Sequence, residues 1–225
     1  MNLLDKVIKV GARGSLLSRK QVEEVFAEFS FFHPGYTFET TWIETTGDRD
    51  LKTSLRSLEK TDFFTKEVEA LQCKGEFRIS IHSAKDLPEK LQEGLQIVAI
   101  TKGVTSADVL VFREGESFET LPFCPKIGSS SPRRDERVQS ILPNCEIVDI
   151  RGTIQKRLEL LVQKQVDAVV MAEAALLRLQ LHQFPRVVLE GETAPLQGKL
   201  AVVALESDQE MLMLFSSIDA RFVKV

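Results

Sequence analysis

Four cationic motifs stand where short apolar runs give way to helical patterns, and they hold the residues of this chain best suited to chemistry. They are Gly-Ala-Arg-Gly-Ser at 11–15, His-Ser-Ala-Lys-Asp at 82–86, Gly-Ser-Ser-Ser-Pro-Arg-Arg at 128–134 and Arg-Gly-Thr at 151–153. In an open α/β sheet the carboxyl ends of the strands share one edge, where ligands bind and helix N-termini offer free N–H groups. Arginine and lysine at that edge favour a ligand with several carboxylates or phosphates.

The chain as a whole is acidic, so these cations are concentrated at particular places. Its 225 residues carry a formal net charge of −4, which argues against general nucleic-acid binding. No apolar run approaches the roughly 18 residues that cross a membrane, and the N-terminus lacks a signal-peptide pattern. The three cysteines lack CxxC spacing and indicate neither a disulfide framework nor a zinc site. We expect a cytoplasmic protein without a bound metal.

Apolar runs alternate with helical patterns along most of the chain, which predicts βαβ units and two mostly parallel sheets. We expect strands at 7–10, 38–43, 78–81, 95–100, 109–112, 127, 147–150, 168–171, 187–189 and 200–205. We expect helices at 16–31, 64–71, 132–142, 154–163, 174–179 and 208–218. Ser131 and Pro132 suit the N-cap and the first position of one of these helices.

Two polar stretches that contain glycine predict that the chain crosses twice between two domains. We expect domain 1 at 1–101 plus 197–225, an inserted domain 2 at 106–192, and hinge segments at 102–105 and 193–196. A basic cleft would then separate the domains. The charged stretch 47–60 leaves from the same sheet edge, and its pattern fits either a mobile lid or a solvated loop or short surface helix.

Further motifs extend the pattern: Thr-Thr-Gly-Asp at 45–48, Phe-Phe-Thr-Lys-Glu-Val-Glu at 63–69 and a run from Val166 to Leu179. With them the chain resembles the porphobilinogen deaminases, also called hydroxymethylbilane synthases, over residues 7–206. The resemblance implies two periplasmic-binding-protein-like α/β domains around a basic cleft, plus a small third domain. It implies a transferase of porphyrin and heme biosynthesis that joins the small molecule porphobilinogen into a linear tetrapyrrole and releases ammonia. The alternative is a non-catalytic binding module for pyrrole polycarboxylates.

The resemblance also implies roles for individual residues. Porphobilinogen carries an acetate and a propionate, which arginine forks bind bidentately. The residues expected to hold such carboxylates are Arg13, Ser15, Ser83, Lys85, Ser129, Ser130, Arg133, Arg134, Arg151, Arg157 and Arg178. Asp86 is expected to stabilise the azafulvenium cation left by ammonia and to assist proton transfer.

The residues alone leave other interpretations open. Asp86 would also suit the turn before Leu87 and Pro88, and Arg157 would suit an ordinary helix surface. Arg178 would complement the C-terminal end of its own helix dipole. His82 follows an apolar strand and reads as a core histidine rather than a base.

The chain departs from the family pattern at three places. Thr61 stands where the family has a lysine, and Lys60 and Lys66 are the candidate substitutes. Leu196 replaces a glycine of the family's Pro-Gly-Gln-Gly hinge, so we expect a stiffer or reshaped segment. The family's dipyrromethane cofactor is bound to a cysteine of the third domain, and the chain ends at Val225, where that domain should begin.

None of Cys73, Cys124 and Cys145 matches the cofactor-attachment motif, so we expect no covalent dipyrromethane on this chain. Cys124, in a proline-flanked loop, is the first cysteine to test. Three interpretations stay open: the cofactor is held differently, another chain supplies it, or the activity is lost. We expect a monomer unless a partner chain supplies the third domain.

Overall fold

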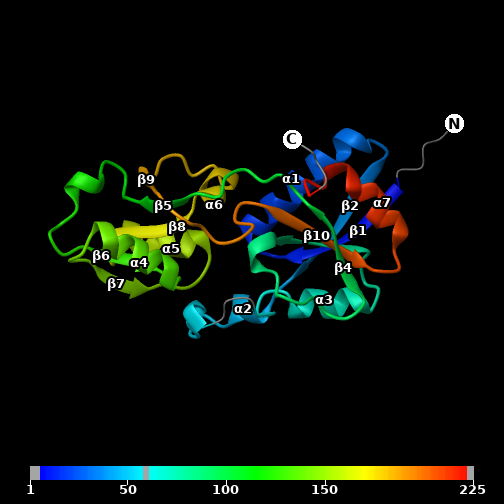
Figure 1. Cartoon of the computed structure of the whole chain (residues 1–225), viewed down its shortest axis with the longest axis horizontal. Helices are drawn as coiled ribbons and strands as arrows, with labels where there is room; N and C mark the ends of the chain where they lie inside the picture. The colour runs from blue at the N-terminus through cyan, green and yellow to red at the C-terminus, as the bar shows by residue number, and fades with distance from the viewer. Residues whose placement is uncertain (1–5, 58–60, 222–225) are drawn as a thin grey trace. The chain divides into compact units, whose positions relative to one another are not determined.

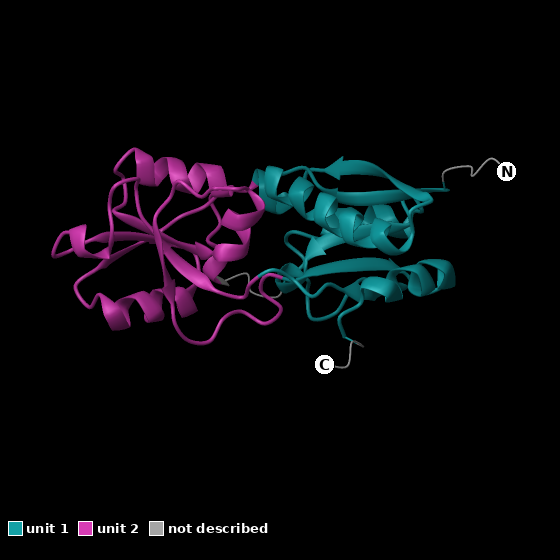
Figure 2. Ribbon diagram, turned by 90° about the horizontal axis from the view of Figure 1, so that it is seen from above, with its two compact units in different colours: residues 1–49, 60–104, 199–225 teal, residues 50–59, 105–198 magenta. Residues whose placement is uncertain are grey.

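The computed structural model describes residues 6–57 and 61–221, and the chain divides into two compact units (Figure 2). Unit 1 comprises residues 1–49, 60–104 and 199–225, and unit 2 comprises residues 50–59 and 105–198. Unit 2 therefore interrupts unit 1 twice, whereas the sequence analysis expected a single insertion.

The extra segment of unit 2 is explained by its ion pairs. Arg56 lies 2.5 Å from Asp135 and 3.4 Å from Asp149. Arg151 donates to the backbone oxygen of Asp50 at 2.6 Å. These contacts tie residues 50–56 to unit 2, whereas the sequence predicted residues 1–101 as one continuous part of domain 1.

The elements of unit 1 are β1 (Lys6–Arg13), α1 (Leu16–Phe32), β2 (Tyr36–Ile43), α2 (Thr46–Arg49), α3 (Lys66–Cys73), β3 (Ile79–Ser83), β4 (Leu95–Ile100), β10 (Leu200–Leu205) and α7 (Gln209–Phe215). Its sheet has the order β2-β1-β3-β10-β4 (Figure 1). β1 pairs parallel with β2 and β3, whereas β10 pairs antiparallel with β3 and β4. Four strands therefore run in one direction, and β10 runs in the other.

Both faces of this sheet are covered by helices. Val25 and Phe29 of α1 and Phe215 of α7 pack on the face that includes Val202 of β10, and the rings of Phe29 and Phe215 stack with centroids 4.6 Å apart. Val203 points to the opposite face, where α3 packs. Since successive strand residues point to opposite faces, burial on both sides explains the continuous apolar run of β10.

Unit 2 repeats this arrangement with β5 (Asp108–Val111), β6 (Lys126–Ser129), α4 (Pro132–Ile141), β7 (Glu146–Asp149), α5 (Ile154–Val162), β8 (Ala168–Ala172), α6 (Glu173–Arg178) and β9 (Arg186–Leu189). Its sheet has the order β7-β6-β8-β5-β9. β6 pairs parallel with β7 and β8, and β5 pairs antiparallel with β8 and β9. Leu158 of α5 and Leu176 of α6 pack on one face, and Val138 of α4 packs on the other.

The expected fold class is confirmed, with one refinement. Each sheet is mixed, because one of its five strands is inverted. Ser131 and Pro132 occupy the N-cap and first position of α4, but the Ser131 side chain makes no capping hydrogen bond. The last α-helix ends at Phe215, and a 3₁₀ turn over Ser216–Ile218 follows it directly. Within residues 6–57 and 61–221, no helix combines the length and apolar character that crossing a membrane requires.

Candidate anion-binding sites

A small pocket opens in unit 1 where β1 and β3 end. Arg13, Ser15, His82, Ser83 and Asp86 are among its lining residues. They come from the first two cationic motifs of the sequence, which the parallel pairing of β1 and β3 brings to one edge. Its volume is about 50 Å³, which at roughly 10 to 15 Å³ per water molecule has room for a few water molecules or a small polar group such as a carboxylate.

Arg13, at the end of β1, is held by two neighbours. Its guanidinium forms an ion pair with Asp48 and lies over the ring of Phe64, with Cζ 4.4 Å from the centroid. A side chain at position 47 would displace that ring, because a Cβ there would lie 2.2 Å from Phe64. The Thr-Thr-Gly-Asp motif thus orients the arginine, a role that the sequence analysis did not assign to it.

Asp48 is itself fixed by Thr45, whose backbone N–H and hydroxyl both donate to its Oδ2, at 3.0 and 2.8 Å. Burial alone would raise the pKa of Asp48. The hydrogen bonds and charge of Arg13, with those from Thr45, nevertheless hold that pKa below the usual carboxyl value. Asp48 is therefore an anion at neutral pH, and Arg13 already has a carboxylate partner within the fold.

Asp86 reaches the pocket through the 3₁₀ turn Ala84–Asp86, which follows β3 directly and also contains Lys85. The hydroxyl of Ser83 accepts from Gln21 at 2.8 Å. The hydroxyl of Ser15, the N-cap of α1, accepts from the backbone N–H of Ser18 at 3.2 Å. In both contacts the serine accepts, which leaves its own hydrogen to donate to a ligand.

His82 is one of the residues that line this pocket, and it is 6% exposed. Burial, and then the charge of Arg13, lower its pKa to about 4. The imidazole is therefore neutral at pH 7. The prediction of a core histidine is confirmed.

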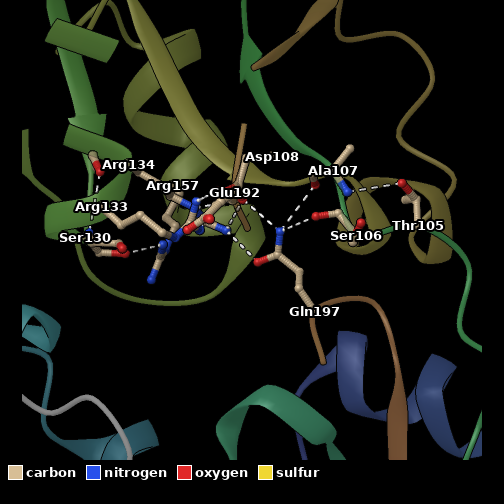
Figure 3. Close-up of polar contacts among 12 residues, drawn as sticks. Thr105, Ser106, Ala107, Asp108, Ser130, Arg133, Arg134, Arg157, Glu192 and Gln197 are labelled. Carbon is tan, nitrogen blue, oxygen red and sulfur yellow. Dashed lines mark hydrogen bonds and ion pairs between the residues drawn. The ribbon is translucent and has the colours of Figure 1, made fainter. Parts of the chain in front are cut away.

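In unit 2 the first turn of α4 carries Arg133 and Arg134, and both bind Asp108 at the start of β5 (Figure 3). Nη2 of Arg133 lies 2.6 Å from Oδ2 of Asp108, and Nε of Arg134 lies 2.9 Å from Oδ1. The amide of Gln197 donates to the same Oδ1 at 2.9 Å. The sequence analysis missed Asp108 and Gln197, because nothing in their local sequence indicates these partners.

Asp108 is almost completely buried, with 2% of its surface exposed. That burial would raise its pKa. The charge and hydrogen bonds of Arg134, with hydrogen bonds from Gln197 and Arg133, nevertheless keep the pKa below the usual carboxyl value. An ionised carboxylate therefore sits between the two arginines.

The remaining expected residues of unit 2 have partners within the fold. Arg157, on α5, donates from Nη1 to the hydroxyl of Ser130 at 2.9 Å and from Nε to the oxygen of Gly152 at 3.0 Å. Figure 3 draws the contact between Ser130 and Arg157 in the same view as Arg133 and Arg134.

Three further expected residues are placed as follows. Ser129 is fully buried at the end of β6. Arg151 donates to Asp50 as described above, and Arg178 donates to the oxygen of Gly198 at 2.8 Å.

Lys66 and the three cysteines are not among the residues of these groups. Lys60 falls outside the described residues, and Lys66 is an exposed residue that begins α3. Burial raises the pKa of the Cys73 and Cys145 thiols, whereas Cys124 is exposed. In the described part of the chain, no three His, Cys, Asp or Glu side chains form a group that could hold a metal ion.

Solved structures define the class of fold. An ancestral cationic amino acid solute binding protein matches with a TM-score of 0.56 and 9% identity, over 96% of this chain and 90% of that chain. The VFT2 domain of BvgS from Bordetella pertussis matches with a TM-score of 0.52 and 15% identity, over 94% and 86%. The fold is thus of the periplasmic-binding-protein type.

Sequence comparison gives the family. The model described as "Porphobilinogen deaminase, dipyromethane cofactor binding domain" matches residues 8–213. A "Probable porphobilinogen deaminase" of Chlamydia pneumoniae is 40% identical over 94% of this chain and 89% of the relative. A "Porphobilinogen deaminase" of Streptococcus sanguinis is 36% identical over 95% of this chain and 72% of the relative. The chain belongs to the porphobilinogen deaminase family.

Proposed function

We propose that this protein joins porphobilinogen units into the linear tetrapyrrole hydroxymethylbilane, releasing one ammonia per unit, as a step of porphyrin and heme biosynthesis. Family membership supports this reaction class. The observation that carries the proposal is the placement of Asp86 and Arg13 in one pocket of unit 1. A carboxylate and a guanidinium that line one pocket match a substrate that carries carboxylates and becomes a cation when ammonia leaves.

Asp86 has the reacting role in this proposal. Loss of ammonia from porphobilinogen leaves a positive charge on the ring system, and a nearby carboxylate stabilises that charge. The same carboxylate can accept a proton from the ring nitrogen or from the carbon that is joined. Asp86 lines the pocket, whereas Asp48, which binds Arg13, does not, so Asp86 is the carboxylate offered to a ligand there.

The cationic residues have a binding role. We propose that Arg13 and the hydroxyls of Ser15 and Ser83 receive a carboxylate in unit 1, with Lys85 beside them. The candidate residues of unit 2 have the same task, which is to bind carboxylates of pyrrole ligands: Ser129, Ser130, Arg133, Arg134, Arg151, Arg157 and Arg178. Guanidinium forks suit this task because they bind carboxylates through two parallel hydrogen bonds.

The residues of unit 1 also suit a dipyrromethane, the group named by the matching family model. Arg13 is a partner for one of its carboxylates, and Asp86 is an acceptor for its pyrrole N–H groups. When bound, this group supplies the pyrrole end to which the first porphobilinogen is joined. We propose that neither Cys73 nor Cys145 anchors it, because burial raises the pKa of both thiols and so disfavours the reactive thiolate.

The test is to incubate the purified protein with porphobilinogen and to measure ammonia and the porphyrin that forms from the linear product. The intact mass of the same preparation, made in heme-competent cells, shows whether a dipyrrole is attached. We expect one ammonia for each porphobilinogen consumed and one linear tetrapyrrole for every four. Binding of porphobilinogen by calorimetry without ammonia release would instead establish the alternative, a non-catalytic module for pyrrole polycarboxylates.

A further inference from the structure

The two neighbouring arginines of α4 stand in an unfavourable place without a counter-charge. Arg133 and Arg134 are adjacent in the first helical turn, where the helix dipole disfavours cations. Both have long side chains with many rotamers, and ordering such side chains opposes ligand binding. A ligand site formed by these two arginines binds tightly only if another residue holds both side chains in place before the ligand arrives.

Asp108 meets this requirement with both of its oxygens. Oδ2 accepts from Nη2 of Arg133 at 2.6 Å. Oδ1 accepts from two nitrogens of Arg134, Nη2 at 2.7 Å and Nε at 2.9 Å. The Asp108 side chain is 3% exposed, that of Arg134 9%, and that of Arg133 31%. The carboxylate is therefore buried behind the arginines, and a ligand would approach from the more exposed Arg133.

Gln197 fixes Asp108 in turn. Its amide nitrogen donates to Oδ1 of Asp108 at 2.9 Å and to the backbone oxygen of Ser106 at 2.7 Å, and its amide oxygen accepts from Arg134 at 3.3 Å (Figure 3). One side chain thus contacts the carboxylate, one arginine and the chain just before β5. The Asp108 side chain is therefore held in one rotamer by Gln197 and by the two arginines.

The arginines keep donors for a ligand. A guanidinium has five N–H groups. Arg133 uses Nη2 for Asp108 and Nη1 for the oxygen of Glu192 at 2.7 Å. Arg134 uses Nε and Nη2. Among the described residues, no contact of Nε of Arg133 or Nη1 of Arg134 is present, so each arginine is held by one edge and retains another.

We infer that Asp108, itself fixed by Gln197, is the positioning residue of Arg133 and Arg134, and that it acts through them on a ligand carboxylate. This inference rests on the proposed function for the identity of the ligand. It assigns no ligand contact to Asp108 or Gln197. A buried carboxylate can have two roles here. As a counter-charge alone it would compete with an anionic ligand for the arginines, whereas as a positioning residue it promotes binding of that ligand.

The direction in which Asp108→Asn changes the affinity for porphobilinogen decides between these roles. Asp108→Asn keeps the shape and removes the charge. If Asp108 only competes, the variant binds porphobilinogen more tightly, since the arginines gain net positive charge. If Asp108 positions the arginines, the dissociation constant measured by calorimetry rises about tenfold or more, the range seen when one partner of a buried ion pair is removed. Tighter or unchanged binding by the folded variant would overturn the inference.

A double-mutant cycle separates positioning from general loss of stability. Asp108→Asn should weaken binding less in the Arg133→Leu background than in the wild type, because one of the two arginines through which Asp108 acts is already gone. Additive effects would contradict the inference. Asp167→Asn is the matched control: it removes a carboxylate that contacts Arg113 and Lys126 elsewhere in unit 2, and it should leave affinity within twofold.

A ligand-free measurement keeps the inference testable if porphobilinogen does not bind and the proposed function fails. Side-chain ¹⁵N spectra of arginine report whether rotation of the guanidinium is restricted. In the wild type Arg133 and Arg134 should give separate, slowly exchanging Nη signals, which should merge in Asp108→Asn but persist in Asp167→Asn. Signals that are unchanged in Asp108→Asn would show that the arginines are held without Asp108.

Discussion

The imidazole of His82 donates its Nε2 hydrogen to the hydroxyl of Ser80, 2.9 Å away. The direction follows from the next bond, because Ser80 gives its own hydrogen to the amide oxygen of Gln72 at 2.7 Å. The amide nitrogen of Gln72 donates to the backbone oxygens of Arg78 and Val203, which fixes its orientation. His82 is therefore held as the neutral Nε2–H tautomer by hydrogen bonds within the core of unit 1.

This relationship predicts a loss of stability in acid. The pKa of His82 is about 4 in the folded protein and about 6.5 when unfolded. Between these values the unfolded state binds more protons, so the free energy of unfolding falls as pH drops from about 6.5 to about 4. At about 1.4 kcal/mol per pKa unit the loss approaches about 3 kcal/mol. Urea unfolding of wild type and His82→Gln at several pH values measures it, and parallel curves for the two proteins would contradict it.

Asp86→Ala should abolish porphobilinogen consumption and leave the fold intact. It removes the carboxylate that stabilises the developing cation, and such losses reduce turnover by roughly 100-fold or more. Ammonia release and thermal melts of wild type, Asp86→Ala and the exposed-site control Glu76→Ala provide the comparison. An Asp86→Ala protein that turns over at the wild-type rate would remove Asp86 from the mechanism.

Leu196→Gly should stabilise the protein by about 0.5 to 1 kcal/mol. Leu196 adopts a φ of 58°, a left-handed conformation that costs a residue with a side chain about 1 to 2 kcal/mol. Glycine removes this strain and loses part of the gain through its more flexible unfolded state. Leu196→Ala retains the strain, so it should not stabilise the protein. Equal effects of glycine and alanine in urea unfolding would show that the strain is absent.

Cys124 should react with a maleimide at least about tenfold faster than Cys73 or Cys145 at pH 7. It is exposed, whereas burial raises the pKa of the other two thiols and lowers their thiolate fraction. Peptide mapping after timed labelling gives the order of modification. The same maps locate any covalent dipyrrole, and a dipyrrole on Cys73 or Cys145 would refute the assignment of those thiols as unreactive.

The sequence predicted most of the elements because their patterns are local. The expected strand 200–205 and the expected start of α4 at Pro132 agree with the structure. Apolar runs carry no information on strand direction, so the inversion of β5 and β10 was not predicted.

The partners of the site residues were not predictable in the same way. Arg13 and Asp48 are 35 residues apart, and Asp108 and Gln197 are 89 apart. Such residues come together only because the tertiary fold brings distant segments of the chain into contact. The sequence identified the arginines through their motifs, and the structure was needed to show that carboxylates from distant segments hold them.

The position of β10 in the sheet has a consequence for biosynthesis of the protein. This strand lies between β3 and β4, yet it is translated only after all of unit 2. The part of unit 1 that is translated before residue 105 therefore cannot complete its own sheet. The backbone groups of β3 and β4 that pair with β10 stay unpaired until a strand about 100 residues later in the sequence is made. Unit 2 can close while unit 1 is still open. Ribosome-bound chains of increasing length should thus acquire protease resistance first over residues 105–198.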